Sequence, residues 1–312
     1  MRHLILTLLV CGAALPALAV SVTIDRGVAA HQVVQAGDDD TARIEAAGTW
    51  GDDGLGIVEV RLTQDEAVLC DWTEAGRAED GTWQGNLRGV PVGGPYTIDW
   101  QVRTPDDSLS STVRVNQVFV GDVWVLAGQS NMQGVARLAG APEPHPRVMM
   151  YGHDEAWQPA RAPVHVLTAA IDPVHGGPRT PEELAAAMAG APENKRGLGP
   201  GLFFARDLTE RTGRPIGLVP CAHGGTSMEE WSPARRDEGG ESLYGSMFRR
   251  FQEAGGAARG VLWYQGESDT RPGQSEDYEQ RFIDFIAAVR RDLGNPELPF
   301  IYVQIGRFTR TP

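Results

Sequence analysis

Residues 123–134 read VWVLAGQSNMQG, an apolar run that ends in a glycine, an amide, a hydroxyl and a second amide. A continuous apolar run rich in β-branched residues is typical of a strand buried on both faces of a parallel sheet. Its polar end stands where such a strand would turn into a helix. Two interpretations are open for Ser130: a nucleophile presented at the turn, or part of a capping box with Gln133.

The same pattern recurs along the second half of the chain. Apolar runs are found at 119–128, 215–222, 260–266 and 298–306. Segments with apolar spacing near 3.6 residues lie between them, at 201–211, 243–254 and 278–293. This alternation predicts an α/β fold in which a parallel sheet lies between two layers of helices.

The region before Val118 has a different pattern. Short runs of period-2 alternation, separated by clusters of Gly, Pro and Asp, occur at 57–62, 96–102 and 112–115. They predict a small β-sandwich. We therefore expect two domains, a β-sandwich-like domain at 20–117 and an α/β domain at 118–312.

The first 19 residues are typical of a signal peptide. Arg2 precedes an apolar stretch from Leu4 to Leu15, and the A-x-A pattern at 17–19 matches a cleavage site. The apolar stretch is short for a bilayer span, which needs about 20 residues. We expect a secreted or periplasmic protein that has no membrane contact once the signal is removed.

Composition limits the possible partners. The net charge of the 312 residues is −13 and no basic cluster is present, so a nucleic-acid partner is not expected. Cys70 and Cys221 stand outside any C-x-x-C or His-rich pattern. We therefore predict no metal site, and no motif for an organic cofactor is found.

Each of the four apolar runs ends in glycines or polar residues, at 128–131, 223–227, 265–269 and 304–306. The carboxyl ends of parallel strands meet at one edge of the sheet, where ligands bind. Ser130 could act there as the nucleophile, with the Gly225 N–H and the Gln265 amide as donors to an oxyanion. Glu267 could orient a histidine or remain an exposed carboxylate.

Three motifs carry a family resemblance: VWVLAGQSNM, then CAHGGTS followed by Trp231, and GVLWYQGESD. Together they resemble the carbohydrate esterases of the SGNH-hydrolase superfamily, and more narrowly the sialate O-acetylesterase and acetylxylan esterase families. The resemblance covers residues 118–306. It implies a three-layer α/β/α domain that removes O-acetyl groups from sugars through an acetyl-serine intermediate.

The resemblance also implies roles for individual residues. Ser130 matches the nucleophile, and its N–H, the N–H of Gly225 and the amide of Gln265 match the oxyanion hole. Glu267 matches an acidic residue that assists the catalytic histidine in some relatives. The family's remaining Asp and His come from an Asp-x-x-His segment near the C-terminus, and no such segment follows Gly306. The resemblance thus implies a C-terminally truncated chain whose catalytic histidine lies beyond Pro312. Within the chain, the one alternative base at this edge of the sheet is His223, which stands beside the glycines of the expected oxyanion hole.

Two other functions fit the same residues. Glu230 and Glu267 could be the paired carboxylates of a glycosidase. The absence of a C-terminal histidine is also compatible with a catalytically impaired carbohydrate-binding protein. The sequence contains no pattern that determines the oligomeric state.

Overall fold

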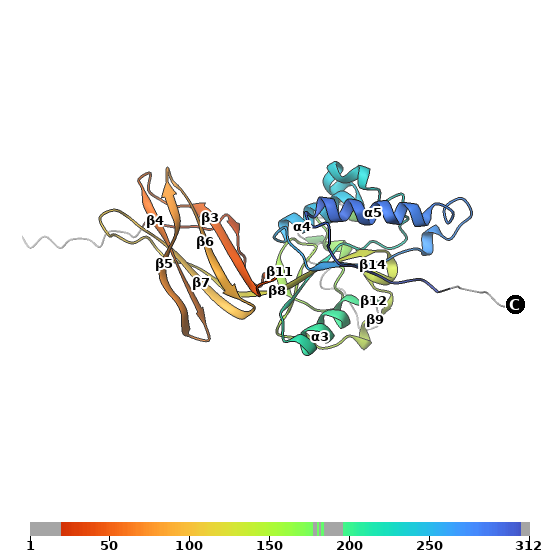
Figure 1. Cartoon of the computed structure of the whole chain (residues 1–312), viewed down its shortest axis with the longest axis horizontal. Coiled ribbons are helices and arrows are strands. Elements are labelled where there is room, and N and C mark those ends of the chain that lie inside the picture. The colour runs from red at the N-terminus through yellow and green to blue at the C-terminus, as the bar shows by residue number, and fades with distance from the viewer. Residues whose placement is uncertain (1–19, 177–179, 181, 184–195, 307–312) are drawn as a thin grey trace, which may run out of the picture.

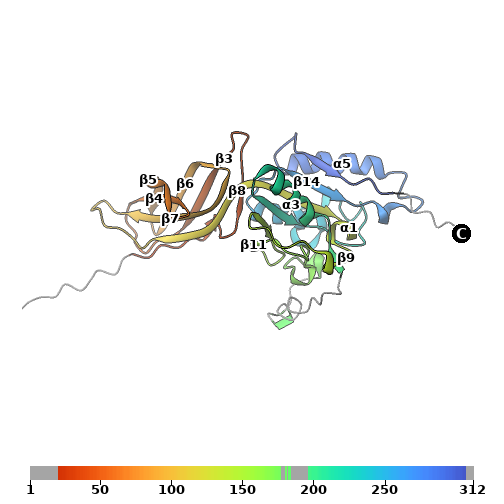
Figure 2. The same cartoon turned by 90° about the horizontal axis from the view of Figure 1, so that it is seen from below.

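The computed structural model describes residues 20–176, 180, 182–183 and 196–306. They form two bodies joined by one long strand, β8 (Val113–Gly128), as Figures 1 and 2 show. The first half of β8 pairs antiparallel with β7 (Gly93–Arg103), and its second half pairs parallel with β13 (Ile216–Pro220) and β14 (Gly260–Tyr264). The predicted signal peptide lies outside the described residues.

The N-terminal body is built from strands that are mainly antiparallel, in the order β1-β3-β6-β5-β4-β7-β8, while the short β2 pairs parallel with β8. The remaining strands of this body are β1 (Arg26–Gly27), β2 (Val33–Gln35), β3 (Thr41–Thr49), β4 (Gly56–Gln64), β5 (Ala67–Glu79) and β6 (Thr82–Pro91). The rings of Trp83 on β6 and Trp100 on β7 lie 5.6 Å apart inside its core. Because these strands are connected in one continuous hydrogen-bonded sheet, the β-sandwich stays a prediction.

The C-terminal body contains the predicted parallel sheet, in the order β11-β10-β13-β8-β14-β15. Every neighbouring pair is parallel except the pair of β10 and the edge strand β11. The other strands are β10 (Val148–Tyr151), β11 (Trp157–Pro159) and β15 (Phe300–Tyr302). Each of the four apolar runs contains one strand, so the α/β class predicted from sequence is confirmed.

Helices cover both faces of this sheet (Figure 1). On one face α4 (Leu243–Glu253) and α5 (Tyr278–Asp292) pack against Val125 and Trp263, and on the other α3 (Gly201–Thr212) packs against Leu126 and Leu262. Successive strand residues therefore point into two different apolar cores. This explains why β8 has a mixed burial pattern in its first, antiparallel part and is buried at every position in the parallel sheet of the C-terminal body.

Charged residues tie the two bodies together beside β8. The carboxylate of Asp122 accepts hydrogen bonds from Arg214 Nε at 2.8 Å and from Arg259 Nε at 3.1 Å. A second nitrogen of Arg214 donates to Asp40 in the N-terminal body at 2.6 Å. The junction thus consists of a continuous strand and an ion network centred on the buried Asp122.

The remaining short elements are α1 (Ser130–Gln133), β9 (Ala136–Arg137), β12 (Arg196–Leu198), and the 3-10 helices η1 (Leu138–Gly140), η2 (Leu167–Ala169), η3 (Pro173–His175), η4 (Pro233–Glu241) and η5 (Glu267–Asp269). None of the helices in the described part of the chain is long and apolar enough to cross a bilayer.

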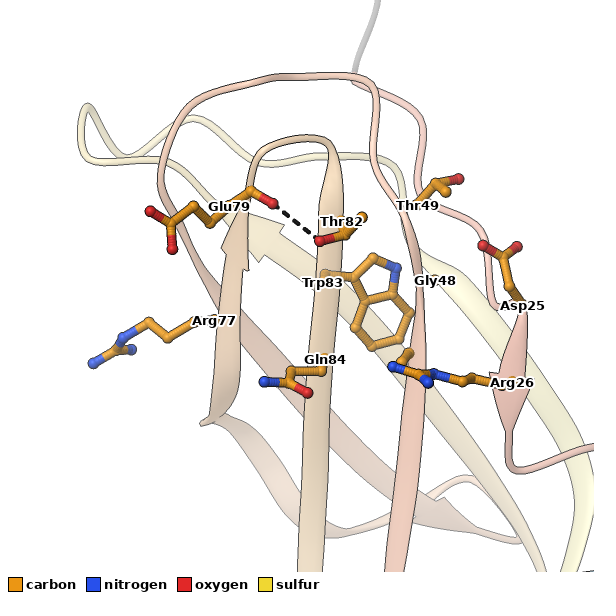
Figure 3. Close-up of a pocket in the computed structure, with 10 residues that line it drawn as sticks. Asp25, Arg26, Gly48, Thr49, Arg77, Glu79, Thr82, Trp83 and Gln84 are labelled. Carbon is orange, nitrogen blue, oxygen red and sulfur yellow. Dashed lines mark hydrogen bonds between the residues drawn. The ribbon is translucent and has the colours of Figure 1, made fainter.

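A hollow of about 480 Å³ lies on the N-terminal body. Figure 3 shows that its labelled side chains are mostly polar and come from β1, β3, β5 and β6 and from Asp25, which directly precedes β1. The Thr82 hydroxyl donates to the Glu79 carbonyl at 3.1 Å. The indole of Trp83 is buried there, and its Nε1 donates to the Thr23 carbonyl at 2.8 Å. The hollow contains none of the predicted catalytic residues.

Candidate active site

Ser130 lies at the turn between β8 and α1, at the carboxyl edge of the sheet. Gly128 has a φ of +128°, and a Cβ at this position would lie 2.2 Å from the Tyr264 carbonyl oxygen. The next amide, that of Gln129, donates to the same carbonyl at 2.8 Å. Only glycine lets the chain turn this close to β14, so Gly128 determines where Ser130 is presented.

The hydroxyl of Ser130 does not cap the helix. The N-cap of α1 is Gln129, and no side chain makes a capping hydrogen bond there. Ser130 is half-buried, and its hydroxyl has no hydrogen-bond partner among the described residues. The capping-box interpretation is therefore wrong, and the hydroxyl is available to a ligand.

The two amides that flank Ser130 bind a single carboxylate. Gln129 Nε2 donates to one oxygen of Glu267, and Asn131 Nδ2 donates to the other. Ser268 Oγ completes the arrangement by donating to Gln129 Oε1 at 2.7 Å. The amide–hydroxyl–amide pattern thus clamps the nucleophile turn to the loop after β14. Sequence reasoning found Glu267 but missed these two partners, although their positions on either side of Ser130 were a usable signal.

The glycine turn after β13 lies directly against Ser130. A Cβ at Gly224 would be 3.3 Å from the Ser130 Cβ, and the Gly224 N–H donates to Gln133 Oε1 at 2.7 Å. Gly225 has a φ of +80° and open space on its Cβ side. Neither the Ser130 nor the Gly225 N–H has a hydrogen-bond partner in the part of the chain that the structure describes. Both N–H groups are therefore available as hydrogen-bond donors.

Gln265 is arranged differently from the expectation. Its side chain is 2% exposed, and its Nε2 donates to the Thr226 carbonyl at 3.0 Å and to a carboxylate oxygen of Asp269. Its Oε1 accepts from the Tyr278 hydroxyl at 3.1 Å. Both amide hydrogens are used inside the protein because a buried amide must be satisfied and a carboxylate is the stronger acceptor. Gln265 therefore braces the loops around the site here and donates nothing to the space beside Ser130.

The second carboxylate of the glycosidase alternative also has a local partner. Glu230 is exposed, and it accepts from the N–H and the hydroxyl of Ser227 at 2.8 and 2.9 Å. Glu267 is held by the two amides described above. Glu230 thus stabilises its own loop and Glu267 joins two loops, which gives no support to an acid–base pair.

A cavity of about 500 Å³ adjoins the end of α1. Gln133 and Gly134 form part of its wall, and the buried rings of His153 and His165 form another part. Burial lowers the pKa of His165 to about 3, so this ring is neutral at physiological pH. Next to it, the buried Arg250 donates to the carbonyls of Tyr151 and Gly152 at 2.9 and 3.0 Å and holds this segment in place.

Another pattern in the sequence was missed. Asp172 and His175 have Asp-x-x-His spacing, although they lie between β11 and β12 and not near the C-terminus. Both are buried, and η3 brings His175 within 3.0 Å of His223, measured between the two Nδ1 atoms. The spacing itself was the available signal.

The parallel sheet, with a serine at the carboxyl end of its central strand, defines an α/β protein with a hydrolase-like architecture. A sequence model of the family described as "Carbohydrate esterase, sialic acid-specific acetylesterase" matches residues 120–312. The chain belongs to this family of carboxylic ester hydrolases, which confirms the class predicted from the sequence motifs.

Individual relatives agree with this assignment. A protein named "Probable carbohydrate esterase" from Arabidopsis thaliana is 32% identical over 219 residues, which cover 63% of this chain and 72% of that protein. The human sialate O-acetylesterase is 27% identical over 278 residues, and these cover 76% of this chain. They span only 50% of the human protein, so this match reaches about half of its length.

A solved structure supports the fold. The carbohydrate acetylesterase from Xanthomonas citri superposes with a TM-score of 0.54 at 24% identity. The match covers 88% of this chain and 58% of that one. At this identity the likeness concerns the fold alone.

Proposed function

We propose that the protein is a serine carbohydrate esterase that removes O-acetyl groups from sugars through an acetyl-serine intermediate. The observation that carries the proposal is the Ser130 hydroxyl, which has no partner among the described residues and lies at a turn against which Gly224 packs. The N–H groups of Ser130 and of Gly225, the next residue, also have no partner there. The family assignment supports an O-acetylated carbohydrate as the substrate. Sialate O-acetylesterase is the activity named for several relatives, and an acetylated sialic acid is one member of this substrate class.

In the proposed mechanism, Ser130 Oγ attacks the acetyl carbonyl while its proton passes to a base. The N–H groups of Ser130 and Gly225 stabilise the negative charge that develops on the carbonyl oxygen. The tetrahedral intermediate then releases the sugar hydroxyl, and water hydrolyses the acetyl-serine. By resemblance we assign the role of the base to the histidine of the family's C-terminal Asp-x-x-His segment, and not to His175. Glu267 acts here as a positioning residue, because its carboxylate is bonded to both neighbours of the nucleophile.

We extend the proposal to the organisation of the chain. Residues 118–312 would be the SGNH-type esterase domain, with three layers, and residues 20–117 a β-sandwich-like domain in front of it. The helices found on both faces of the parallel sheet support the first assignment. The signal-peptide pattern of residues 1–19 supports a secreted or periplasmic location.

The test compares Ser130→Ala with the matched control Ser232→Ala, whose hydroxyl also makes no hydrogen bond among the described residues. Hydrolysis of p-nitrophenyl acetate and of an acetylated sugar should fall at least about 10³-fold in kcat for the first variant only. A serine-directed phosphonate should label Ser130. Unchanged hydrolysis in Ser130→Ala would refute the proposal, and sugar binding without any ester hydrolysis by the unmodified protein would favour the carbohydrate-binding alternative.

A further inference from the structure

Four histidine rings lie in a row next to the candidate active site. His153 contacts His165 and His175, and His175 contacts His223, with ring centroids 5.1–5.9 Å apart. Among the residues that the structure describes, no group of three or more His, Cys, Asp or Glu side chains is arranged to hold a metal ion.

A chain of hydrogen bonds leads from a buried carboxylate to His223. Ser246 Oγ, on α4, lies 2.5 Å from Asp172 Oδ2 and 3.3 Å from His175 Nε2. The opposite ring nitrogen, His175 Nδ1, lies 3.0 Å from His223 Nδ1. Arg249 Nε donates to the other oxygen of Asp172 at 3.0 Å, so this carboxylate is paired as an anion.

The direction of each hydrogen bond follows from the number of protons available. An ionised Asp172 only accepts, so the single hydroxyl hydrogen of Ser246 is donated to it. Ser246 Oγ must then accept from His175 Nε2–H. A neutral His175 has only one ring hydrogen, so its Nδ1 is an acceptor and His223 Nδ1–H is the donor. The Nε2 of a neutral His223 therefore carries a lone pair and no hydrogen.

Both rings are neutral at physiological pH. Burial lowers the pKa of His175 to about 3, and the neighbouring His223 and Arg250 act in the same direction. Burial also lowers the pKa of His223, although the Glu230 carboxylate opposes this change. A neutral, desolvated pair of imidazoles accepts a hydrogen bond readily but takes up a full proton poorly.

His223 belongs to the edge of the candidate site. His223 directly precedes the Gly224–Gly225 turn that lies against Ser130, and its own N–H donates to the Gly128 carbonyl at 3.0 Å. The ring is half-buried, and its Nε2 has no hydrogen-bond partner within the described ranges. No hydrogen bond joins this ring to Ser130 there either.

We propose that Asp172, Ser246 and His175 position His223 so that its Nε2 accepts a hydrogen bond from a free sugar hydroxyl next to the acetylated oxygen. His223 then determines specificity for sugar esters with a free neighbouring hydroxyl. Asp172, Ser246 and His175 act through it as positioning residues. This inference rests on the proposed esterase function.

The kinetic test uses His223→Phe with two substrates, a mono-acetylated sugar with a free neighbouring hydroxyl and p-nitrophenyl acetate, which has none. Loss of one neutral hydrogen bond should lower the ratio of kcat/KM for the sugar ester to kcat/KM for the aryl ester roughly 3- to 10-fold. His223→Gln, whose Oε1 can accept, should recover part of the loss. An equal, large loss on both substrates would identify His223 as a general base, and no loss on either would also overturn the inference.

A second readout needs no turnover. In protein with ¹⁵N-labelled histidine, the NMR signals of His223 should show a protonated Nδ1 and a bare Nε2, and the Nε2 signal should shift when the acetylated sugar is added. His175→Leu removes the acceptor, so His223 should move towards the Nε2–H tautomer. Ser246→Ala serves as a milder variant if the first is unstable, and His145→Leu is the control. Wild-type His223 protonated at Nε2 would refute the inference, whereas missing ester hydrolysis alone would refute only the proposed function.

Discussion

Replacing Glu267 with glutamine tests whether this carboxylate holds the nucleophile turn. The carboxylate accepts from Gln129 and Asn131, which flank Ser130. Glutamine keeps one acceptor oxygen, but its NH₂ group then faces the NH₂ of one of these amides. One charge-assisted hydrogen bond is lost and a donor is left opposite a donor, which costs about 2 kcal/mol at this half-buried position. The melting temperature should fall by roughly 4–8 °C.

Activity should change together with stability. If the turn loosens, Ser130 is displaced relative to the Gly225 N–H, and we expect kcat for acetyl esters to fall roughly 10- to 100-fold. The side-chain amide NMR signals of Gln129 and Asn131 should shift in the variant. The matched control is Glu229→Gln, at an exposed position whose side chain makes no hydrogen bond among the described residues.

Two outcomes would refute this reasoning. If stability, activity and both amide signals were unchanged, the clamp would have no role. If activity fell and its pH dependence changed while stability and the amide signals of Gln129 and Asn131 stayed constant, Glu267 would act on a histidine, as the family resemblance implies, and not on the turn.

Two further predictions concern Gly128 and His165. Gly128→Ala should destabilise the protein by about 2–4 kcal/mol in chemical unfolding, because the new Cβ would meet backbone atoms of β14. Gly294→Ala, which has a φ of +74° but open space around its Cβ, should cost only roughly 1 kcal/mol, and equal costs would contradict the close approach. The pKa of His165 is about 3 in the folded protein and about 6.5 in the unfolded chain. Between these two pH values the unfolded chain binds one more proton than the folded protein, so the free energy of unfolding decreases as the pH falls. His165→Leu should reduce this loss between pH 7 and pH 4, and an unchanged slope would show that His165 does not contribute.

Local patterns predicted much of the α/β body. The helices predicted at 201–211, 243–254 and 278–293 end within one residue of α3, α4 and α5, because amphipathic spacing and nearby glycines mark helix ends. The apolar runs became parallel strands because only a strand covered on both faces needs apolar side chains at every position. The location of Ser130 followed from the glycine before it.

The positions of the surrounding side chains depend on contacts between distant parts of the chain. Gln265 was predicted as a donor to the ligand, but Asp269 and Thr226 occupy its amide, and this choice depends on how two loops pack. The chain of hydrogen bonds from Asp172 to His223 joins three separate segments through Ser246. Apart from the Asp-x-x-His spacing, no local sequence pattern predicts that these three segments contact one another.

By itself, the sequence determined which segments are strands and helices and which edge of the sheet holds the polar residues, since these follow from periodicity and strand direction. Only the tertiary structure decided that β8 runs through both bodies, that two amides clamp Glu267, and that Ser246 links Asp172 to His175. These features depend on which donors and acceptors are brought within about 3 Å of one another. That distance is set by the packing of whole elements and not by the order of residues along the chain.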